Sequence, residues 1–285
     1  MFNYILYRIG QFIALSLPLK VGYAIAIFVS DLRYIFARQD RICVFNNLRA
    51  IFPDKPYKQL RRIRRNMFRN FAKYLVDFFR FSKLDKNYIR NNVLIENKHY
   101  FDQALSLNKG MIILTAHLGN WELGGVIMAL SGYPFWAVAL EHKYKRVNDF
   151  FNSQRESKGI TVIPFRRAVR QCLNVLKEKK ILALVGDRDF TGRGVEVNFF
   201  GKPAMLPEGP AAFSLKTGAV IVPAFMVRND DDTFTLRIEE PLETPLEYNK
   251  ENLIDLTNRY KVIFERYVSK YPDQWYMFKN FWNPD

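Results

Sequence analysis

The sequence predicts an α/β fold: a mostly parallel central sheet flanked by helices, with a helical, membrane-associating extension at the N-terminus. From residue 111 onward, short apolar runs alternate with helical stretches of about 10–15 residues, as in parallel strands joined by helical crossovers. Up to about residue 81, apolar residues recur instead at helical spacing. The first part should therefore be helical, and the sheet should lie in the second.

The alternating region gives its strands and helices in a regular order. Expected strands are 111–116, 135–140, 160–165, 181–186, 195–200, 219–228 and 233–240. Expected helices are a segment beginning at Trp121 and the ranges 145–157, 166–180, 208–217 and 249–271. The turn NDDD separates the last two strands, so we expect a final hairpin that adds an antiparallel edge to the sheet.

The N-terminal region, 1–36, is apolar but interrupted. A spanning helix needs about 20 mostly apolar residues, and Pro18 and Lys20 break the most apolar stretch, Phe12 to Val29. We therefore expect two short amphipathic helices lying in the membrane interface, followed by one domain over 37–285. A single spanning helix and a soluble helical hairpin remain alternatives.

Composition narrows the choice of partners. The 285 residues are 49% hydrophobic, which excludes a disordered chain, and the net charge of +15 favours nucleic acid, an anionic membrane or a phosphorylated substrate. The helix expected over 57–81 has a basic first half, which is either a solvated face or a surface for anionic headgroups. The distant Cys43 and Cys172 are typical of free thiols in a reducing compartment.

The segment TAHLGNWELGG, residues 115–125, places His117 at the end of a strand, where open α/β sheets bind ligands. Gly119 allows a tight bend, and Asn120 can cap the helix that starts at Trp121. Glu122, in the first helical turn, can fold back toward the imidazole, fix its tautomer and raise its basicity. In the alternative, the histidine is a satisfied polar residue and the glutamate only favours the helix dipole.

This segment resembles the His-(four residues)-Asp/Glu block of glycerolipid and lipid A acyltransferases. Its form is similar to that of the lauroyl/myristoyl acyltransferases of lipid A assembly and of phosphatidylinositol mannoside acyltransferases. Three more blocks are similar in the same order: NNLRAIFPDKP, the segment 184–225 and YPDQWYMFKNFW at 271–282. The resemblance spans roughly residues 40–282. It departs at LPEGPAAF, where Pro210 replaces a threonine, so Glu208 is read as the start of a helix with Pro207 in its first turn.

The resemblance implies an O-acyltransferase with no cofactor, whose donor is an acyl-carrier-protein or coenzyme A thioester. It implies a glycolipid acceptor, a lipid A precursor before a phosphatidylinositol mannoside, and a place at the cytoplasmic face of the inner membrane, peripheral or held by one anchor. A basic nucleic-acid-binding protein is a remote alternative, though no nucleic-acid partner is expected, and a non-catalytic membrane scaffold is another. The three histidines show no metal-ligand spacing.

Three carboxylates compete to partner His117. Glu122 ranks first by proximity, and Glu196 second, since it matches the family position that pairs with the histidine in the mannoside branch. Glu141 ends a strand and could face the same cleft. The backbone amides of Gly119 and Asn120 are the expected donors to the oxyanion.

Polar residues after the strand 181–186 should lie at the same sheet edge. By resemblance, Asp187, Arg188 and Asp189 belong to the active-site block, with Arg188 suited to a phosphate or the pantetheine phosphodiester, unless they form a local ion-pair network. Weaker substrate-binding candidates are Arg155, Arg193 and Lys202, with His142 as an accessory and His99 on the surface. Phe78, Phe79 and Phe81 either line an acyl groove or, more simply, pack in the core.

Overall fold

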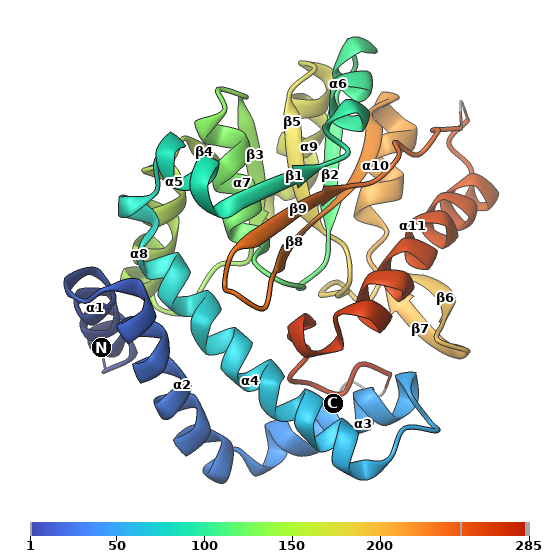
Figure 1. Ribbon diagram of the computed structural model, residues 1–285. Coiled ribbons are helices and arrows are strands. Elements are labelled where there is room, and N and C mark those ends of the chain that lie inside the picture. Colours follow the sequence, from blue (N-terminus) through green and yellow to red (C-terminus); the bar gives the residue numbers. More distant parts are fainter. Residues whose placement is uncertain (1, 246, 283–285) are drawn as a thin grey trace.

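A seven-stranded sheet forms the centre of the computed structural model (Figure 1). The structure describes residues 2–245 and 247–282. The strand order is β1-β9-β8-β2-β5-β3-β4, and every neighbouring pair is parallel except β8 and β9. The strands are β1 (Val93–Glu96), β2 (Met111–Thr115), β3 (Phe135–Ala139), β4 (Ile160–Pro164), β5 (Ile181–Val185), β8 (Val220–Arg228) and β9 (Phe234–Ile238). The predicted mostly parallel α/β sheet is confirmed.

Two details of the predicted sheet are wrong. The strand β6 (Val195–Phe199) is not in the main sheet but pairs antiparallel with β7 (Lys202–Leu206) in a separate two-stranded sheet beside α11 (Figure 1). The hairpin of β8 and β9 is not the edge, because β1 pairs with the outer side of β9. Both errors come from short strands, β1 and β7, that carry little periodicity.

Helices cover both faces of the sheet, and the side chains of the central strand β2 point alternately into the two cores that these helices form. Ile112 and Leu114 pack in the core formed with α9, α10 and α11, whereas Met111 and Ile113 pack in the core formed with α4, α6, α7 and α8. The helices are α3 (Arg38–Ile51), α4 (Tyr57–Phe79), α5 (Lys86–Asn92), α6 (Lys98–Ser106), α7 (Trp121–Leu130), α8 (Lys145–Glu156), α9 (Ala168–Lys177), α10 (Gly209–Thr217) and α11 (Lys250–Lys270). Short 3-10 turns lie at Phe81–Lys83, Phe165–Arg167 and Pro272–Gln274.

The N-terminal region forms two helices, α1 (Phe2–Ser16) and α2 (Leu19–Phe36), as predicted. They are separate because Pro18 lacks an N–H and cannot continue α1. In the described part of the chain, no helix combines the length and the apolarity needed to cross a membrane. The predicted boundary at residue 36 coincides with the end of α2; the division itself stays a prediction, and its outer limits, residues 1 and 285, lie outside the described residues.

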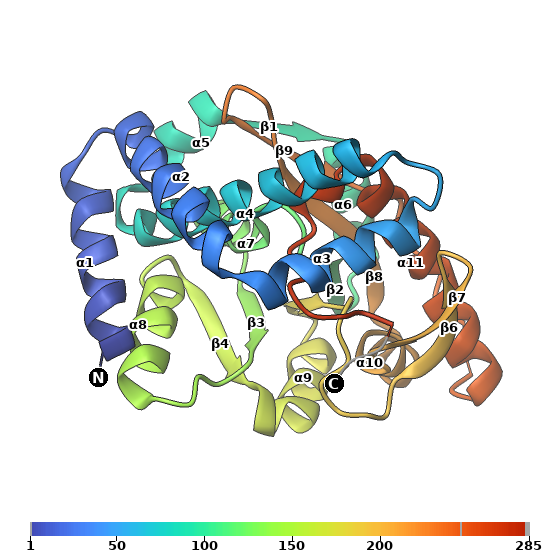
Figure 2. The same cartoon turned by 90° about the horizontal axis from the view of Figure 1, so that it is seen from below.

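The helices α2 and α4 run side by side (Figure 2). Asp31 of α2 joins them by accepting bidentate hydrogen bonds from Arg65 and Arg69, with distances of 2.5–3.1 Å. Part of the basic half of α4 is thus structural. The other face of α1 and α2 leaves a row of apolar side chains exposed: Ile5, Leu6, Ile9, Phe12, Val21, Ile25, Phe28, Val29, Leu32, Ile35 and Phe36.

Candidate active site

His117 lies in the tight turn that joins β2 to α7, as the sequence predicts. Gly119 has φ of +64°, and a Cβ there would lie 1.9 Å from the carbonyl oxygen of Met226, so only glycine fits. Asn120 caps α7, since its side-chain oxygen accepts a hydrogen bond from the backbone N–H of Leu123 at 3.1 Å. The turn holds the imidazole at the carboxyl edge of the sheet.

Asp187 is the carboxylate that pairs with His117. Its Oδ1 lies 2.6 Å from Nδ1 of the imidazole, and its Oδ2 accepts a hydrogen bond from the indole N–H of Trp275 at 2.9 Å. The two residues meet because β5, which precedes Asp187, is hydrogen-bonded to β2 in parallel register. A carboxylate so placed fixes the ring tautomer and leaves Nε2 free to act.

The charge of Asp187 is secured by its surroundings. Burial raises the pKa of this carboxyl group, but the charge of His117, the hydrogen bonds from His117 and Trp275 and the nearby Arg188 outweigh burial and lower the pKa to about 2. Asp187 is therefore a carboxylate at neutral pH, although it is only 1% exposed. An ionised carboxylate can only accept, so Nδ1 of the imidazole carries a proton.

The prediction that Glu122 partners His117 is wrong. The carboxylate of Glu122 is bound by the guanidinium of Arg155, with Nη2–Oε1 at 2.5 Å and Nε–Oε2 at 2.9 Å. Both side chains are mostly buried and both line the cavity that contains His117. Arg155, on α8, thus binds the carboxylate of Glu122 on α7, and this carboxylate does not pair with His117.

Glu196 is not brought to His117 either. Along β6 the buried side chains are Val195, Val197 and Phe199, and Glu196 points to solvent between them. It lines a separate hollow beside the start of α11. Glu141 lies at the rim of the main cavity, exposed, with its carboxylate 3.5 Å from Arg166.

The expected oxyanion donors are occupied. The backbone N–H of Gly119 donates to the carbonyl of Gln274 at 2.9 Å, and that of Asn120 donates to the carbonyl of Met226 at 2.8 Å. These bonds clamp the turn between β8 and the C-terminal segment. The prediction that these two amides receive the oxyanion is therefore wrong, since each already has a carbonyl partner.

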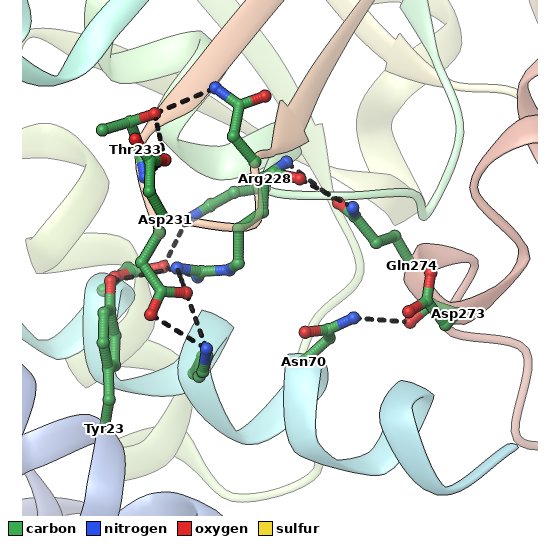
Figure 3. Close-up of polar contacts among 12 residues, drawn as sticks. Tyr23, Asn70, Arg228, Asp231, Thr233, Asp273 and Gln274 are labelled. Atoms are coloured by element: carbon green, nitrogen blue, oxygen red, sulfur yellow. Dashed lines mark hydrogen bonds and ion pairs between the residues drawn. The ribbon is translucent and has the colours of Figure 1, made fainter. Parts of the chain in front are cut away.

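Residues 273–276, in the C-terminal segment, also hold the turn that carries His117. The backbone N–H of Tyr276 donates to the carbonyl of His117 at 2.9 Å. The segment is itself anchored, because the side-chain amide of Gln274 pairs with the backbone of Arg228 at 2.8 and 2.9 Å, and Asn70 donates to the carbonyl of Asp273 at 3.1 Å (Figure 3). The last block of the sequence thus helps to build the site, a role that sequence reasoning missed.

The other residues after β5 take different roles. Arg188 lines the cavity and donates from Nη2 to the carbonyl of Tyr276, while its buried Nε has no partner. Asp189 shapes the loop, because it accepts hydrogen bonds from Thr191 and Gly194 at 2.6–2.8 Å. Asp189 thus forms a local network of hydrogen bonds rather than the ion pairs of the alternative, and both Arg188 and Asp189 line the cavity.

The outer candidates divide between the cavity rim and the surface. Arg193 is exposed at the rim, whereas Lys202 lies over the ring of Trp282 and is absent from the cavity lining. His142 is at the rim, with its ring 4.5 Å from that of Phe151. His99 is exposed, as predicted. Glu208 precedes α10 as predicted, but the proline in the first turn is Pro210, not Pro207.

The site opens into a cavity of about 1500 Å³. Small side chains make the room: Ala137 and Ala183 pair in register on β3 and β5, and Gly124 and Gly125 face the cavity from α7. Its other apolar lining includes Phe71, Tyr74, Leu75, Phe101, Ile113, Met128, Phe135, Ile160, Ala224, Met226, Leu236 and Ile238. Phe78, Phe79 and Phe81 pack in the core, which was the simpler of the two expectations.

Over the ranges 2–245 and 247–282, no group of three or more His, Cys, Asp or Glu side chains could hold a metal ion. Cys43 and Cys172 are free thiols, as predicted; both are buried, and neither lines the cavity. The groups at the site are therefore a histidine–carboxylate pair, partly buried cations and a mostly apolar cavity.

Comparison with known proteins adds relatives to this geometry. A family model described as bacterial lipid A biosynthesis acyltransferase matches residues 1–283. The chain is 27% identical over 220 residues to a phosphatidylinositol mannoside acyltransferase from Mycolicibacterium smegmatis, an alignment covering 76% of this chain and 71% of that protein. A protein of the same name from Mycobacterium tuberculosis is 30% identical over 160 residues, covering 54% of this chain and about half, 51%, of that protein.

Among solved structures, the chain is similar to the 1-acyl-sn-glycerophosphate (LPA) acyltransferase PlsC from Thermotoga maritima. The TM-score is 0.41 at 13% identity, with 88% of this chain and 98% of that chain covered.

Proposed function

Because this chain belongs to the bacterial lipid A biosynthesis acyltransferase family, we propose that it moves a fatty acyl chain from an acyl thioester to a hydroxyl group of a glycolipid. The acyltransferase class follows from the family. The single observation that carries the finer proposal is the His117–Asp187 pair, whose imidazole lines a cavity of about 1500 Å³. An apolar cavity with a few convergent polar groups suits a ligand with a long hydrocarbon chain and one reactive end.

The proposed reaction is a direct transfer. His117 takes the proton from the acceptor hydroxyl, whose oxygen attacks the thioester carbonyl carbon; the C–S bond then breaks, and the imidazolium returns the proton to the departing thiolate. Asp187 stabilises the imidazolium that forms between these steps. Neither Cys43 nor Cys172 lines the cavity, so the proposal needs no acyl-cysteine intermediate.

Cations at the cavity suit the donor. Acyl-carrier-protein and coenzyme A thioesters both carry a pantetheine phosphodiester, which Arg188 inside the cavity and Arg193 at its rim can attract. Arg155 is committed to Glu122, and we propose that this pair positions the cavity wall.

The membrane is proposed as the place of reaction. The exposed apolar row on α1 and α2 is larger than a scatter of single residues, which favours a surface that packs against lipid. Exposed cations at the start of α4, among them Lys58, Arg61 and Arg62, supply charge for anionic headgroups. We propose a peripheral position on the cytoplasmic face of the inner membrane.

Two glycolipids compete as acceptor. The family match over residues 1–283 favours a lipid A precursor. The names of the relatives from Mycolicibacterium smegmatis and Mycobacterium tuberculosis favour a phosphatidylinositol mannoside as the second candidate. Mass spectrometry of lipids from cells with and without the protein distinguishes them, because only the true acceptor loses one acyl chain.

The test of the proposed function is His117→Ala, assayed with a radiolabelled acyl thioester and each purified glycolipid. Loss of the base should lower the transfer rate about 10²–10⁴-fold without changing association with anionic vesicles. His99→Ala, at an exposed histidine, is the matched control and should transfer at the wild-type rate. Normal transfer by His117→Ala would show that the base is assigned wrongly.

A further inference from the structure

One wall of the main cavity is built from aromatic side chains. They come from α4, from the start of α7 and from the C-terminal segment, and all of them line the cavity: Phe71, Tyr74, Trp121, Tyr276 and Phe278. Their rings pack on one another at centroid distances of 4.6–6.1 Å. These five side chains, here called the aromatic wall, therefore form one continuous surface beside the site.

Trp121 is the part of the aromatic wall that lies against the base. The centroid of its ring is 5.1 Å from that of His117, with the two planes at 71°, and the indole stacks on Tyr74 at 4.6 Å. The side chain of Trp121 is only partly buried, and both it and His117 line the cavity. A group bound against Trp121 can therefore bring a hydroxyl within reach of the imidazole.

Two polar hydrogens of the aromatic wall are available to a ligand. The indole N–H of Trp121 and the hydroxyl of Tyr74 donate to no described residue, and neither is among the buried atoms that lack a partner, so both keep accessible surface at the cavity. Burial raises the pKa of Tyr74 well above its ordinary value, so the phenol keeps its proton at neutral pH. A hydrocarbon chain would leave both donors unpaired, whereas a ligand with oxygen atoms would not.

We propose that the aromatic wall binds the sugar ring of the acceptor glycolipid, with the indole N–H of Trp121 donating to a sugar oxygen. The proposal rests on the proposed function. A pyranose ring fits this surface, because its slightly positive C–H groups pack on the negative faces of aromatic rings while its oxygens accept hydrogen bonds. Trp121 is then a positioning residue that holds one sugar hydroxyl toward His117. The acyl chain keeps the space beside the small side chains of Ala137 and Ala183.

The kinetic test compares Trp121→Leu, which removes the ring and its N–H, with Trp121→Phe, which keeps a ring. Trp121→Leu should raise KM for the glycolipid about tenfold and leave KM for the acyl thioester within about twofold of wild type, with Trp121→Phe between the two. Trp136→Leu is the matched control, because Trp136 is also partly buried but does not line the cavity, and its KM for the glycolipid should equal that of wild type. A wild-type KM for the glycolipid in Trp121→Leu, or a rise only in KM for the thioester, would overturn the proposal.

A second measurement uses the wild-type protein and needs no turnover. The four tryptophans give separate indole N–H signals in the NMR spectrum of protein labelled with ¹⁵N-tryptophan, and the signal lost in Trp121→Phe identifies Trp121. Octyl β-glucoside below its critical micelle concentration should shift this signal. Octane-1,2-diol, which has hydroxyls and a similar tail but no sugar ring, should not.

An unshifted Trp121 signal with the glucoside, or equal shifts with both probes, would contradict the sugar site. If wild type moves no acyl chain but the glucoside alone still shifts the Trp121 signal, the proposed function fails while the sugar site stands.

Discussion

Two buried carboxylates hold the turn that carries His117, one from each side. Asp187, after β5, binds the imidazole and the indole of Trp275. Asp77, on α4, accepts a hydrogen bond from the side-chain amide of Asn120 at 3.0 Å, at the other end of the turn. Both residues are at most 5% exposed, so burial alone does not distinguish the carboxylate proposed to act in catalysis from the structural one.

Their partners distinguish them. Asp77 is ion-paired with the guanidinium of Arg228, itself only 6% exposed, and also accepts from the hydroxyl of Tyr23 on α2. Figure 3 shows Tyr23 beside Arg228, whose Nη1 donates to the phenol oxygen at 3.1 Å. Arginine keeps its charge at every pH where the fold persists, so the guanidinium paired with Asp77 cannot act as a base. Asp187 instead faces a titratable ring that reaches the cavity.

The comparison teaches that the same residue type serves chemistry or folding according to what it binds. A carboxylate beside a base that opens into a cavity can stabilise a charge that comes and goes. A carboxylate beside a permanent cation ties helices to the sheet, here α2 and α4 to β8. Each variant below separates these two roles.

The largest effect is expected from Asp187→Asn. An amide neither stabilises the imidazolium nor enforces the proton at Nδ1, so kcat should fall about 10²–10⁴-fold while the folded structure persists. Steady-state kinetics and circular dichroism measure the two quantities. Asp102→Asn, at an exposed aspartate, is the control and should match wild type. If Asp187→Asn kept full activity, the two carboxylates would not differ as described.

The second effect falls on stability. Asp77→Ala removes the carboxylate that binds Nη2 of Arg228 and leaves this buried guanidinium only Asp232, 3.3 Å from Nη1, as an ionic partner. The free energy of unfolding should fall by about 3 kcal/mol, the lower end of the effect of breaking a buried ion pair. Urea denaturation measures the loss. Replacing both partners, as in Asp77→Leu with Arg228→Met, should recover much of it, because no buried charge is then left alone. Equal losses in the single and double variants would mean that packing, not charge, dominates the cluster.

Acid sharpens the comparison further. The pKa of Asp187 is lowered from its ordinary value to about 2, so its carboxylate stabilises the fold above about pH 4, and this contribution is lost as the pH falls toward 2. The difference in unfolding free energy between wild type and Asp187→Asn should therefore shrink by on the order of 2 kcal/mol across that window. Urea denaturation of both proteins between pH 5 and 2 measures it, and a constant difference would argue against a depressed pKa.

Local features of the site were predictable from the sequence. Gly119 and Asn120 follow an apolar run and precede a helical pattern, so the bend and the cap could be derived from neighbouring residues. The partner of His117 could not, because Asp187 is 70 positions away and becomes a neighbour only when β5 pairs with β2. Glu122 is close to His117 in sequence, yet its carboxylate is paired with Arg155 of another helix.

The C-terminal segment shows the same limit. The residue types of Gln274 and Tyr276 do not indicate their backbone contacts. The carbonyl of Gln274 accepts from the N–H of Gly119, and the N–H of Tyr276 donates to the carbonyl of His117. Likewise, Glu196 is expected beside His117 from its match to a family position, whereas its exposure follows from one face of the two-stranded sheet being open to solvent. Sequence periodicity indicates which face of a helix or strand is buried. Which residues of different elements meet depends on the topology of the fold, which periodicity does not reveal.

The smallest effect is expected from a substitution of Glu196. Glu196→Gln removes a charge from an exposed side chain that lies outside the main cavity, so kcat and the melting temperature should stay within the error of wild type. Glu122→Gln is the informative counterpart, because it leaves the mostly buried Arg155 without its carboxylate and should lower the melting temperature. Glu122 and Glu196 both match family positions, so assaying the two variants side by side tests whether contacts at the cavity identify the acids that matter. A large loss of kcat in Glu196→Gln would show that β6 swings toward His117 during turnover, and the Asp187 pairing would then describe only the resting site.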